Sequence, residues 1–184
     1  MDVRQESNST QKKNRTTVER KSERELVTTR LFNAPAQIVF HAWTTPELFQ
    51  RWWVPPSFGL TLLSYEADFR VGGHYRLVFS HPAAPEPMAF FGTYLEVTPH
   101  SRLVWTNEEA GEPGQVTTVT FVEQGSQTLL TVHDLYPSKQ ALDEAIASES
   151  TGALPEQFEQ LDTILLTLDC LHDPNLILPT TEAF

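Results

Sequence analysis

The longest helical pattern of the chain lies near its C-terminus, between Leu154 and Cys170. Its apolar side chains recur at steps of three and four residues, which places them on one side of a helix: Leu154, Phe158, Leu161, Leu165 and Leu168. Pro155 suits the first turn, and Glu156 and Glu159 add negative charge near the positive end of the helix dipole. The pattern therefore predicts a long amphipathic helix whose apolar side requires a cover.

Most of the chain before this helix alternates between apolar and polar residues, as β-strands with one buried face do. The first such segment runs from Glu25 to Phe32. Six more follow between turn residues, at about 60–69, 73–79, 89–97, 102–107, 115–123 and 128–134. Their short connections favour an antiparallel meander, since a parallel pair needs a crossover of about a dozen residues.

Three shorter helices complete the predicted elements. Asn33-Ala34-Pro35 begins the first, because its proline fits a first turn and either residue before it can cap the helix. Thr45-Pro46-Glu47 repeats this start signal for a second helix, and a third follows Ser138, a good cap. This order of elements predicts an α+β protein in which a curved sheet of about seven strands wraps around the long C-terminal helix.

The length and composition indicate one domain. The chain has 184 residues, of which 40% are hydrophobic, and this length fits a single domain of ordinary size. Residues 1–22 are nearly devoid of apolar groups and cannot offset the entropy of becoming ordered, so a disordered polar tail is predicted there. We expect a single domain over residues 23–172 and a C-terminal extension over residues 173–184.

Charge and targeting signals narrow the possible partners. The formal net charge is −11, and residues 1–24 hold seven basic and four acidic residues, so their balance of +3 leaves −14 for residues 25–184. Such an acidic domain repels phosphate backbones, and nucleic acid is not expected as a partner. The single cysteine, Cys170, excludes an intrachain disulfide. Neither a secretion signal nor a membrane span is recognised, so a cytoplasmic location is expected.

Few side chains offer chemistry. The six histidines show no metal-ligand spacing, and neither a nucleophile elbow nor a glycine-rich phosphate loop occurs, so neither a metal nor a cofactor is predicted. Glu66 and Asp68 lie two residues apart on one strand face, as an acid and base pair would, but Arg70 on the same face favours a charged, solvent-exposed surface. Tyr65 and Phe69 belong to the opposite, inward face. Binding is therefore favoured over catalysis.

Motifs spread over about residues 24–170 carry a resemblance to a known family. They occur in this order: Asn33-Ala34-Pro35, Val39-Phe40-His41-Ala42-Trp43-Thr44-Thr45-Pro46-Glu47, Arg51-Trp52-Trp53, Val71-Gly72-Gly73-His74-Tyr75-Arg76, Gly92-Thr93-Tyr94-Leu95-Glu96-Val97, Arg102-Leu103-Val104-Trp105, Val119-Thr120-Phe121 and Phe158-Glu159-Gln160-Leu161-Asp162. Together they resemble the SRPBCC (START-related) superfamily, and within it the group similar to the C-terminal domain of the activator of the 90-kDa heat-shock protein ATPase. The resemblance implies a helix-grip fold, with a cavity between sheet and helix that holds apolar small molecules in various members.

The residues that line such a cavity can be predicted from inward-facing positions. A curved sheet is wider than a helix of about 10 Å diameter, so bulky side chains must fill the remaining space or leave it open. His133, near the end of the last strand, is the predicted polar anchor. At Phe158 this chain departs from many relatives, which carry tryptophan near the start of the long helix. The other predicted ligand-binding residues are Tyr75, Phe79, Phe90, Tyr94, Trp105, Phe158, Leu161 and Leu165.

Three hypotheses for the function follow. The leading one is binding of an apolar or amphipathic small molecule between the sheet and the C-terminal helix. The second is an enzyme of the polyketide cyclase/aromatase type acting on a cavity-bound substrate, which requires a titratable group inside the cavity with a shifted pKa. The third is a chaperone-interaction module, whose protein partner would contact an exposed apolar patch larger than about a few hundred Å².

Overall fold

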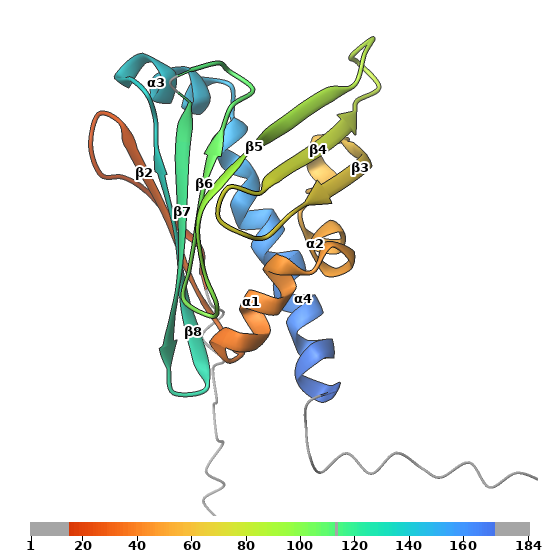
Figure 1. The fold of residues 1–184 in the computed structure, drawn as a ribbon, viewed down its shortest axis with the longest axis vertical. Coiled ribbons are helices and arrows are strands. Elements are labelled where there is room, and N and C mark those ends of the chain that lie inside the picture. Colours follow the sequence, from red (N-terminus) through yellow and green to blue (C-terminus); the bar gives the residue numbers. More distant parts are fainter. Residues whose placement is uncertain (1–14, 113, 172–184) are drawn as a thin grey trace, which may run out of the picture.

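A curved antiparallel sheet of eight strands frames the protein in the computed structural model, which describes residues 15–112 and 114–171 (Figure 1). The strands are β1 (Thr17–Arg20), β2 (Glu25–Phe32), β3 (Thr61–Ala67), β4 (His74–Ser80), β5 (Met88–Thr98), β6 (Arg102–Asn107), β7 (Gln115–Gln124) and β8 (Gln127–Leu135). Their order in the sheet is β1-β2-β8-β7-β6-β5-β4-β3. Strands β3 to β8 therefore form the predicted meander, and β2 closes it beside β8.

The N-terminal strand β1 is the eighth strand, one more than the sequence predicts. It pairs with β2 in the register Val18↔Thr28, and its Arg20 Nη1 lies 2.7 Å from Asp143 Oδ1. All four residues of β1 are exposed, so backbone pairing holds it rather than a buried face. The expectation of a disordered tail over residues 1–22 is wrong for residues 17–20. Residues 1–14 and the expected extension at 173–184 lie outside the described residues.

Two short helices and the long C-terminal helix occupy the concave side of the sheet, and a further short helix lies beyond the upper ends of the strands (Figure 1). They are α1 (Ala36–Thr44), α2 (Pro46–Trp52), α3 (Lys139–Ala147) and α4 (Ala153–Leu171), with the short 3₁₀ turns η1 (Pro56–Phe58) and η2 (Ser150–Gly152). Ser138 caps α3 as predicted, because its Oγ accepts a hydrogen bond from the Ala141 backbone N–H at 3.1 Å. The residue at the N-cap of α1 is Pro35 rather than Asn33 or Ala34, and no side chain caps that helix.

The main core lies between the concave face of the sheet, α4 and the two short helices α1 and α2. Phe158 on α4 has no solvent exposure, and its ring meets Phe32 of β2 edge-on at 5.4 Å and Trp43 of α1 at 6.5 Å. Figure 1 shows α1 and α2 beside the lower half of α4, where they fill the concave space. The upper end of α4 has no such helix between it and the sheet.

Strand β5 bends the sheet at this upper end. Its first half pairs with β4 and its second half with β6, and the change of partner falls near Gly92 and Tyr94. A Cβ atom at Gly92 would lie 1.8 Å from the Thr106 carbonyl oxygen, so only glycine allows β6 to approach this closely. A register shift between Tyr94 and Glu96 adds to the bend. Strands β3 to β5 consequently diverge from the rest of the sheet (Figure 1).

Candidate ligand-binding cavity

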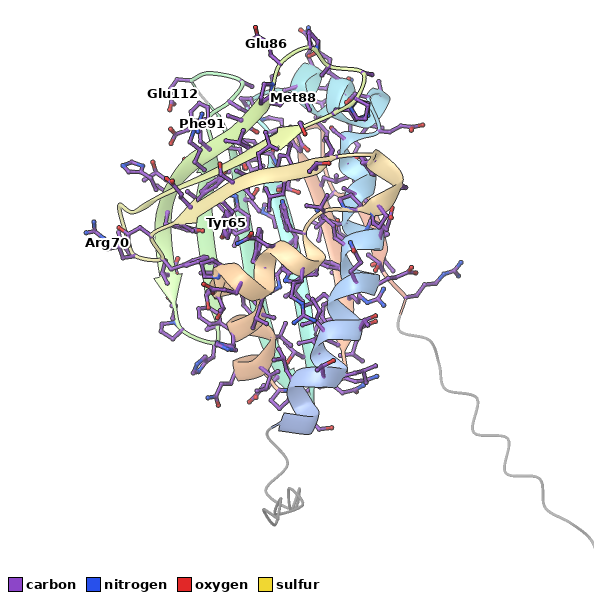
Figure 2. All side chains as sticks on the ribbon, turned by 90° about the vertical axis from the view of Figure 1, so that its right-hand side faces the viewer. Tyr65, Arg70, Glu86, Met88, Phe91 and Glu112 are labelled. Atoms are coloured by element: carbon purple, nitrogen blue, oxygen red, sulfur yellow. The ribbon has the colours of Figure 1, made fainter. Side chains whose placement is uncertain are left out.

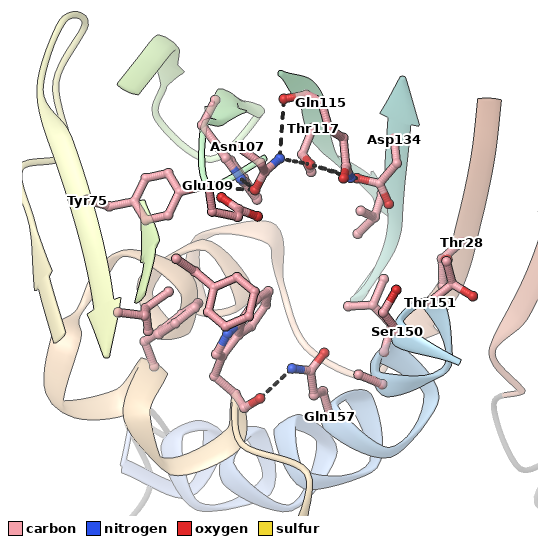
Figure 3. Close-up of a pocket in the computed structure, with 18 of the residues that line it drawn as sticks. Thr28, Tyr75, Asn107, Glu109, Gln115, Thr117, Asp134, Ser150, Thr151 and Gln157 are labelled. Carbon is pink, nitrogen blue, oxygen red and sulfur yellow. Dashed lines mark hydrogen bonds between the residues drawn. The ribbon is translucent and has the colours of Figure 1, made fainter. Parts of the chain in front are cut away.

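A cavity of about 370 Å³ lies where the sheet diverges from the beginning of α4. Strands β2 to β8 form its walls, and α1, α2 and the segment around η1 close one side. The 3₁₀ turn η2 and the first turn of α4 form the remaining lip through Ser150, Thr151, Leu154 and Gln157 (Figure 3). The cavity therefore occupies the half of the concave space that α1 and α2 leave free.

Aromatic rings make up most of the wall. Tyr75 and Tyr94 approach to 5.8 Å between ring centroids, and Tyr94 meets Trp105 at 6.4 Å. Strand alternation orients these rings inward, as the sequence predicts, while Glu66 and Arg70 of the opposite face are exposed. The twelve aromatic residues of the lining are Trp43, Phe49, Trp53, Phe58, Tyr65, Phe69, Tyr75, Phe79, Phe90, Tyr94, Trp105 and Tyr136.

A cluster of polar side chains closes one end of the cavity (Figure 3). Asp134 Oδ1 accepts hydrogen bonds from the Thr117 hydroxyl at 2.6 Å and from the Gln115 amide at 2.8 Å. The Asn107 amide in turn donates to Thr117 Oγ1 at 2.9 Å. The Tyr75 hydroxyl lies 2.9 Å from Asn107 Oδ1 and thereby joins the cluster to the aromatic wall. These groups come from β4, β6, β7 and β8, so the sheet itself fixes their positions.

Burial changes the acidity of the groups in this cluster. Asp134 is 8% exposed, and loss of hydration raises its pKa, although the hydrogen bonds from Thr117 and Gln115 act in the opposite direction. Burial also raises the pKa values of Tyr75 and Tyr94 far above those of ordinary phenols. These tyrosines are therefore neutral at physiological pH, and Asp134 is the carboxyl group of the cavity interior that can change its charge.

Two glutamines of α4 hold the segment that follows α2 against the cavity. The Gln157 amide donates to the Trp53 carbonyl oxygen, and the Gln160 amide donates to the Trp52 and Val54 carbonyl oxygens at 3.1 and 2.9 Å. The carbonyl groups at the end of a helix have no intrahelical partner, so these bonds satisfy them. They fix Trp53 at the edge of the cavity, where its indole lies among the lining residues.

Five of the nine predicted ligand-binding residues line the cavity, and four do not. Those in the lining are Tyr75, Phe79, Phe90, Tyr94 and Trp105. Phe158, Leu161 and Leu165 are buried in the core instead, because this part of α4 packs against α1, α2 and strand β2. From α4, the cavity is contacted by Ala153, Leu154 and Gln157.

The predicted polar anchor His133 lies on the other face of β8. Its Nε2 is 3.0 Å from Glu25 Oε1, and its ring is absent from the cavity lining. Asp134, the next residue, is the one that faces the cavity, because successive strand residues point to opposite sides. The buried positions Thr128, Leu130, Val132 and Asp134 share one face, and this alternation was the available signal for Asp134.

Other candidate chemistry from the sequence has a structural role. Asp68 Oδ2 and Arg70 Nε form an exposed ion pair at 2.5 Å, and Figure 2 shows Arg70 projecting from the molecule. Gly72 adopts a φ of 79°, as the turn between β3 and β4 requires. Within residues 15–112 and 114–171, no three side chains of histidine, cysteine, aspartate or glutamate come close enough to hold a metal ion. No described helix is long and apolar enough to cross a membrane.

The curved sheet that holds a C-terminal helix, with a cavity between them, defines a helix-grip protein. The chain belongs to the family of activator of Hsp90 ATPase homolog 1-like proteins, whose model matches residues 33–165. The family resemblance and the α+β helix-grip fold expected from the sequence are thereby confirmed. Family membership supports, at a coarse level, a ligand-binding or chaperone-related module. No curated protein sequence gives a significant match.

Solved structures of several bacterial proteins share the fold. A Rhodobacter sphaeroides protein matches with a TM-score of 0.75 at 22% identity, covering 83% of this chain and 99% of that chain. A Nitrosomonas europaea protein matches with a TM-score of 0.71 at 22% identity, covering 83% of this chain and 100% of that chain. A Staphylococcus epidermidis protein matches with a TM-score of 0.64 at 26% identity, covering 83% and 94%. At such identities the likeness establishes the fold.

Proposed function

We propose that the protein binds an apolar or amphipathic small molecule in the cavity between the sheet and the beginning of α4. The observation that carries this proposal is the combination of twelve aromatic side chains with one polar cluster around about 370 Å³ of space. Small-molecule sites are typically apolar cavities of about 300–1,000 Å³ with a few converging polar groups. The apolar body of the ligand lies among the rings, and its polar end meets Asn107, Gln115 and Asp134.

Fluorescence offers a direct test, because Trp43, Trp53 and Trp105 line the cavity. N-phenylnaphthylamine is a neutral, apolar probe that absorbs where tryptophan emits. Titration of the probe should produce saturable energy transfer from tryptophan with a dissociation constant of about 1–10 μM, corresponding to about 7–8 kcal/mol of binding free energy. A linear, non-saturating signal would contradict the proposal.

A pair of matched variants locates the bound probe. Ala153→Trp places a large ring at the lip of the cavity, whereas Ala147→Trp places the same ring at the exposed end of α3. We expect the first variant to weaken probe binding at least about tenfold and the second to leave it unchanged. The energy-transfer titration is repeated with both, after circular dichroism has verified their folds. Equal binding by both variants would place the probe elsewhere on the molecule.

One observation favours an enzyme of the polyketide cyclase/aromatase type as a second candidate. Asp134 is a buried carboxyl group with a raised pKa that lines the cavity, and a protonated carboxyl can donate to a substrate carbonyl in general acid catalysis. The expected sign of catalysis is conversion of a bound polyketide-like carbonyl compound into a cyclised isomer with a changed retention time, or into its dehydrated product with the mass of one water lost, which Asp134→Asn fails to produce. Recovery of the compound unchanged from the native protein supports binding alone.

The family name also suggests a chaperone-interaction module, which would use an exposed apolar surface rather than the cavity. Strands β3 and β5 and the turn before β4 carry exposed apolar side chains, among them Leu63, Val71, Phe91 and Leu95 (Figure 2 labels Phe91). The measurement for this function is ATP hydrolysis by the Hsp90-type chaperone of the same organism with and without the purified protein. An unchanged hydrolysis rate would contradict it.

A further inference from the structure

The charges in the cavity lining are all of one sign. Its ionisable side chains are the carboxyl groups of Glu109 and Asp134 and the hydroxyls of four tyrosines, and no described residue of the lining is a lysine, arginine or histidine. The molecule as a whole is also acidic, with a formal net charge of −11. A ligand carboxylate would therefore meet repulsion and find no cation to pair with. A positively charged ligand group would be attracted both to the molecule and to the cavity.

The hydrogen bonds of the polar cluster leave an acceptor unused rather than a donor. Asp134 Oδ1 accepts from Thr117 and Gln115, whereas Oδ2 accepts a hydrogen bond from no described residue. Within the cluster the Asn107 amide is engaged, since it is directed to Thr117 Oγ1 at 2.9 Å and to the Gln115 carbonyl oxygen at 3.5 Å. Elsewhere in the lining, Thr28 Oγ1 and Trp43 Nε1 are buried without a hydrogen-bond partner. Figure 3 shows Asp134 at the end of the cavity beside Gln115 and Thr117. A ligand group that binds Asp134 Oδ2 must therefore donate.

The aromatic walls add a second attraction for a cation. The faces of tyrosine and tryptophan rings attract ammonium groups within about 6 Å, more strongly where water is excluded. Tyr75 approaches the cluster most closely, since its hydroxyl lies 2.9 Å from Asn107 Oδ1, and Trp105 Nε1 donates to the same oxygen at 3.3 Å. A cation beside Asp134 would thus have a carboxylate on one side and aromatic rings nearby.

We propose that the ligand of this cavity is an amine-bearing amphipathic molecule, whose protonated amine donates to Asp134 Oδ2 and whose apolar body lies among the aromatic rings. This inference rests on the binding function proposed above and names its ligand class. Two other sources of a hydrogen-bond donor, a neutral alcohol and a protonated carboxylic acid, are separated from the amine by the experiment below.

The proposed contact makes binding depend on pH. Around Asp134 the titratable groups are Glu109 at the rim, Tyr75 and Tyr136 in the lining, and His133 with Glu25 on the opposite face of the sheet. Both tyrosines stay neutral because burial raises their pKa values. Burial likewise raises the pKa values of Asp134 and Glu109, so lowering the pH protonates both carboxylates. Loss of the Asp134 charge weakens amine binding, and comparison with Asp134→Asn separates its effect from that of Glu109.

A matched set of three ligands tests the proposal. Naphthylethylamine, naphthylethanol and naphthylacetate share one ring system and differ in the polar end, and each competes with N-phenylnaphthylamine for the cavity. At neutral pH the amine should bind at least about tenfold more tightly than the acetate, because hydrogen bonds between charged groups contribute about 1.5–3 kcal/mol, and the alcohol should lie between them.

Asp134→Asn should reverse the preference of the cavity for the amine over the acetate, while the hydrogen bonds to Thr117 and Gln115 are kept. Asparagine Oδ1 can accept from Thr117 and Gln115 as aspartate does, while its amide replaces Oδ2 by a donor. Amine affinity should fall at least about tenfold, acetate affinity should rise, and alcohol affinity should change less than about threefold. Asp143→Asn removes the same charge from exposed α3, outside the cavity, and should leave all three affinities unchanged.

The possible results separate the ligand class from the binding function. Acetate binding as tight as amine binding, or equal affinities of amine and alcohol, would overturn the amine proposal while probe binding stands. Failure of the probe itself to bind would overturn both. If Asp134→Asn does not fold, the affinities of the three ligands for the native protein at neutral and acidic pH decide the question alone, since the proposal requires that only amine binding weakens on acidification.

Discussion

The variant Phe158→Ala tests whether the Phe158 side chain belongs to the core or to the cavity wall. The ring has no solvent exposure and is held between Phe32 of β2 and Trp43 of α1. Core phenylalanine to alanine changes cost about 3–5 kcal/mol, through lost transfer free energy and the cavity left behind. The neighbours of Phe158 belong to a strand and a helix that are themselves packed, so the space cannot collapse. We therefore expect Phe158→Ala to lower the free energy of unfolding by about 4–5 kcal/mol.

Phe90→Ala is the matched control. Phe90 lines the cavity, is 38% exposed, and meets the Phe79 ring at 5.7 Å. Removal of the Phe90 ring should lower the free energy of unfolding by about 1 kcal/mol or less and should weaken binding of N-phenylnaphthylamine. Phe158→Ala should lower the thermal midpoint by about 8–20 °C, given about 2–4 °C per kcal/mol for a domain of this size.

Urea titration of both variants at unchanged m-value, with and without the probe, provides the comparison. Similar costs for the two variants would refute the assignment of Phe158 to the core. A cost near 1 kcal/mol for Phe158→Ala together with altered probe affinity would place that ring in the cavity wall instead.

Three further predictions concern other parts of the fold. Gly92→Ala should lower the free energy of unfolding by about 3 kcal/mol or more, because the new Cβ would overlap the Thr106 carbonyl group. Gly152→Ala, where the new Cβ meets open space, should be nearly neutral in the same urea titration. Asp162→Asn leaves Arg30, which is 5% exposed, without its charged partner and should cost about 1–3 kcal/mol; no change in the denaturation midpoint would show that the pair contributes nothing. Burial raises the pKa of Asp134, so its protonated form stabilises the fold below the unfolded value of about 3.9, and this contribution is lost as the pH rises through the raised pKa. The unfolding free energy of the native protein minus that of Asp134→Asn should accordingly fall as the pH rises above about 4, and a difference that rises with pH would contradict the raised pKa.

The sequence was sufficient for strands β2 to β8, for the four helices and for the inward faces of most strands. Alternation placed Tyr75 and Phe79 of β4 correctly, because the two faces of that strand differ clearly in polarity. It did not decide between His133 and Asp134, since both faces of β8 mix apolar and polar residues and a one-residue shift exchanges them. Strand β1 escaped detection because it buries no side chain, so its pairing left no hydrophobic pattern.

The apolar side of α4 shows a different limit of sequence analysis. Helical periodicity identifies which residues of α4 are buried, and Phe158, Leu161 and Leu165 are indeed buried. Periodicity does not say what covers them. In this fold α1, α2 and β2 cover the middle of α4, and α4 lines the cavity only through Ala153, Leu154 and Gln157. Whether a buried residue of α4 belongs to the core or to the cavity wall depends on how the segment between β2 and β3 packs against it. This long-range packing cannot be predicted from a local sequence pattern.

Two unfavourable features coincide in the cavity, namely unfilled space between aromatic rings and a buried carboxyl group with an unused oxygen. Aromatic side chains around unfilled space forgo the packing contacts that stabilise the rest of the core. Asp134 forgoes hydration and gains only two hydrogen bonds in return, both to Oδ1. By contrast, the buried Arg30 has a carboxylate partner in Asp162. Proteins retain such locally destabilising features mainly at functional sites. Larger apolar residues at the lip, or a neutral residue at position 134, should therefore stabilise the ligand-free protein. The same substitutions should abolish amine binding.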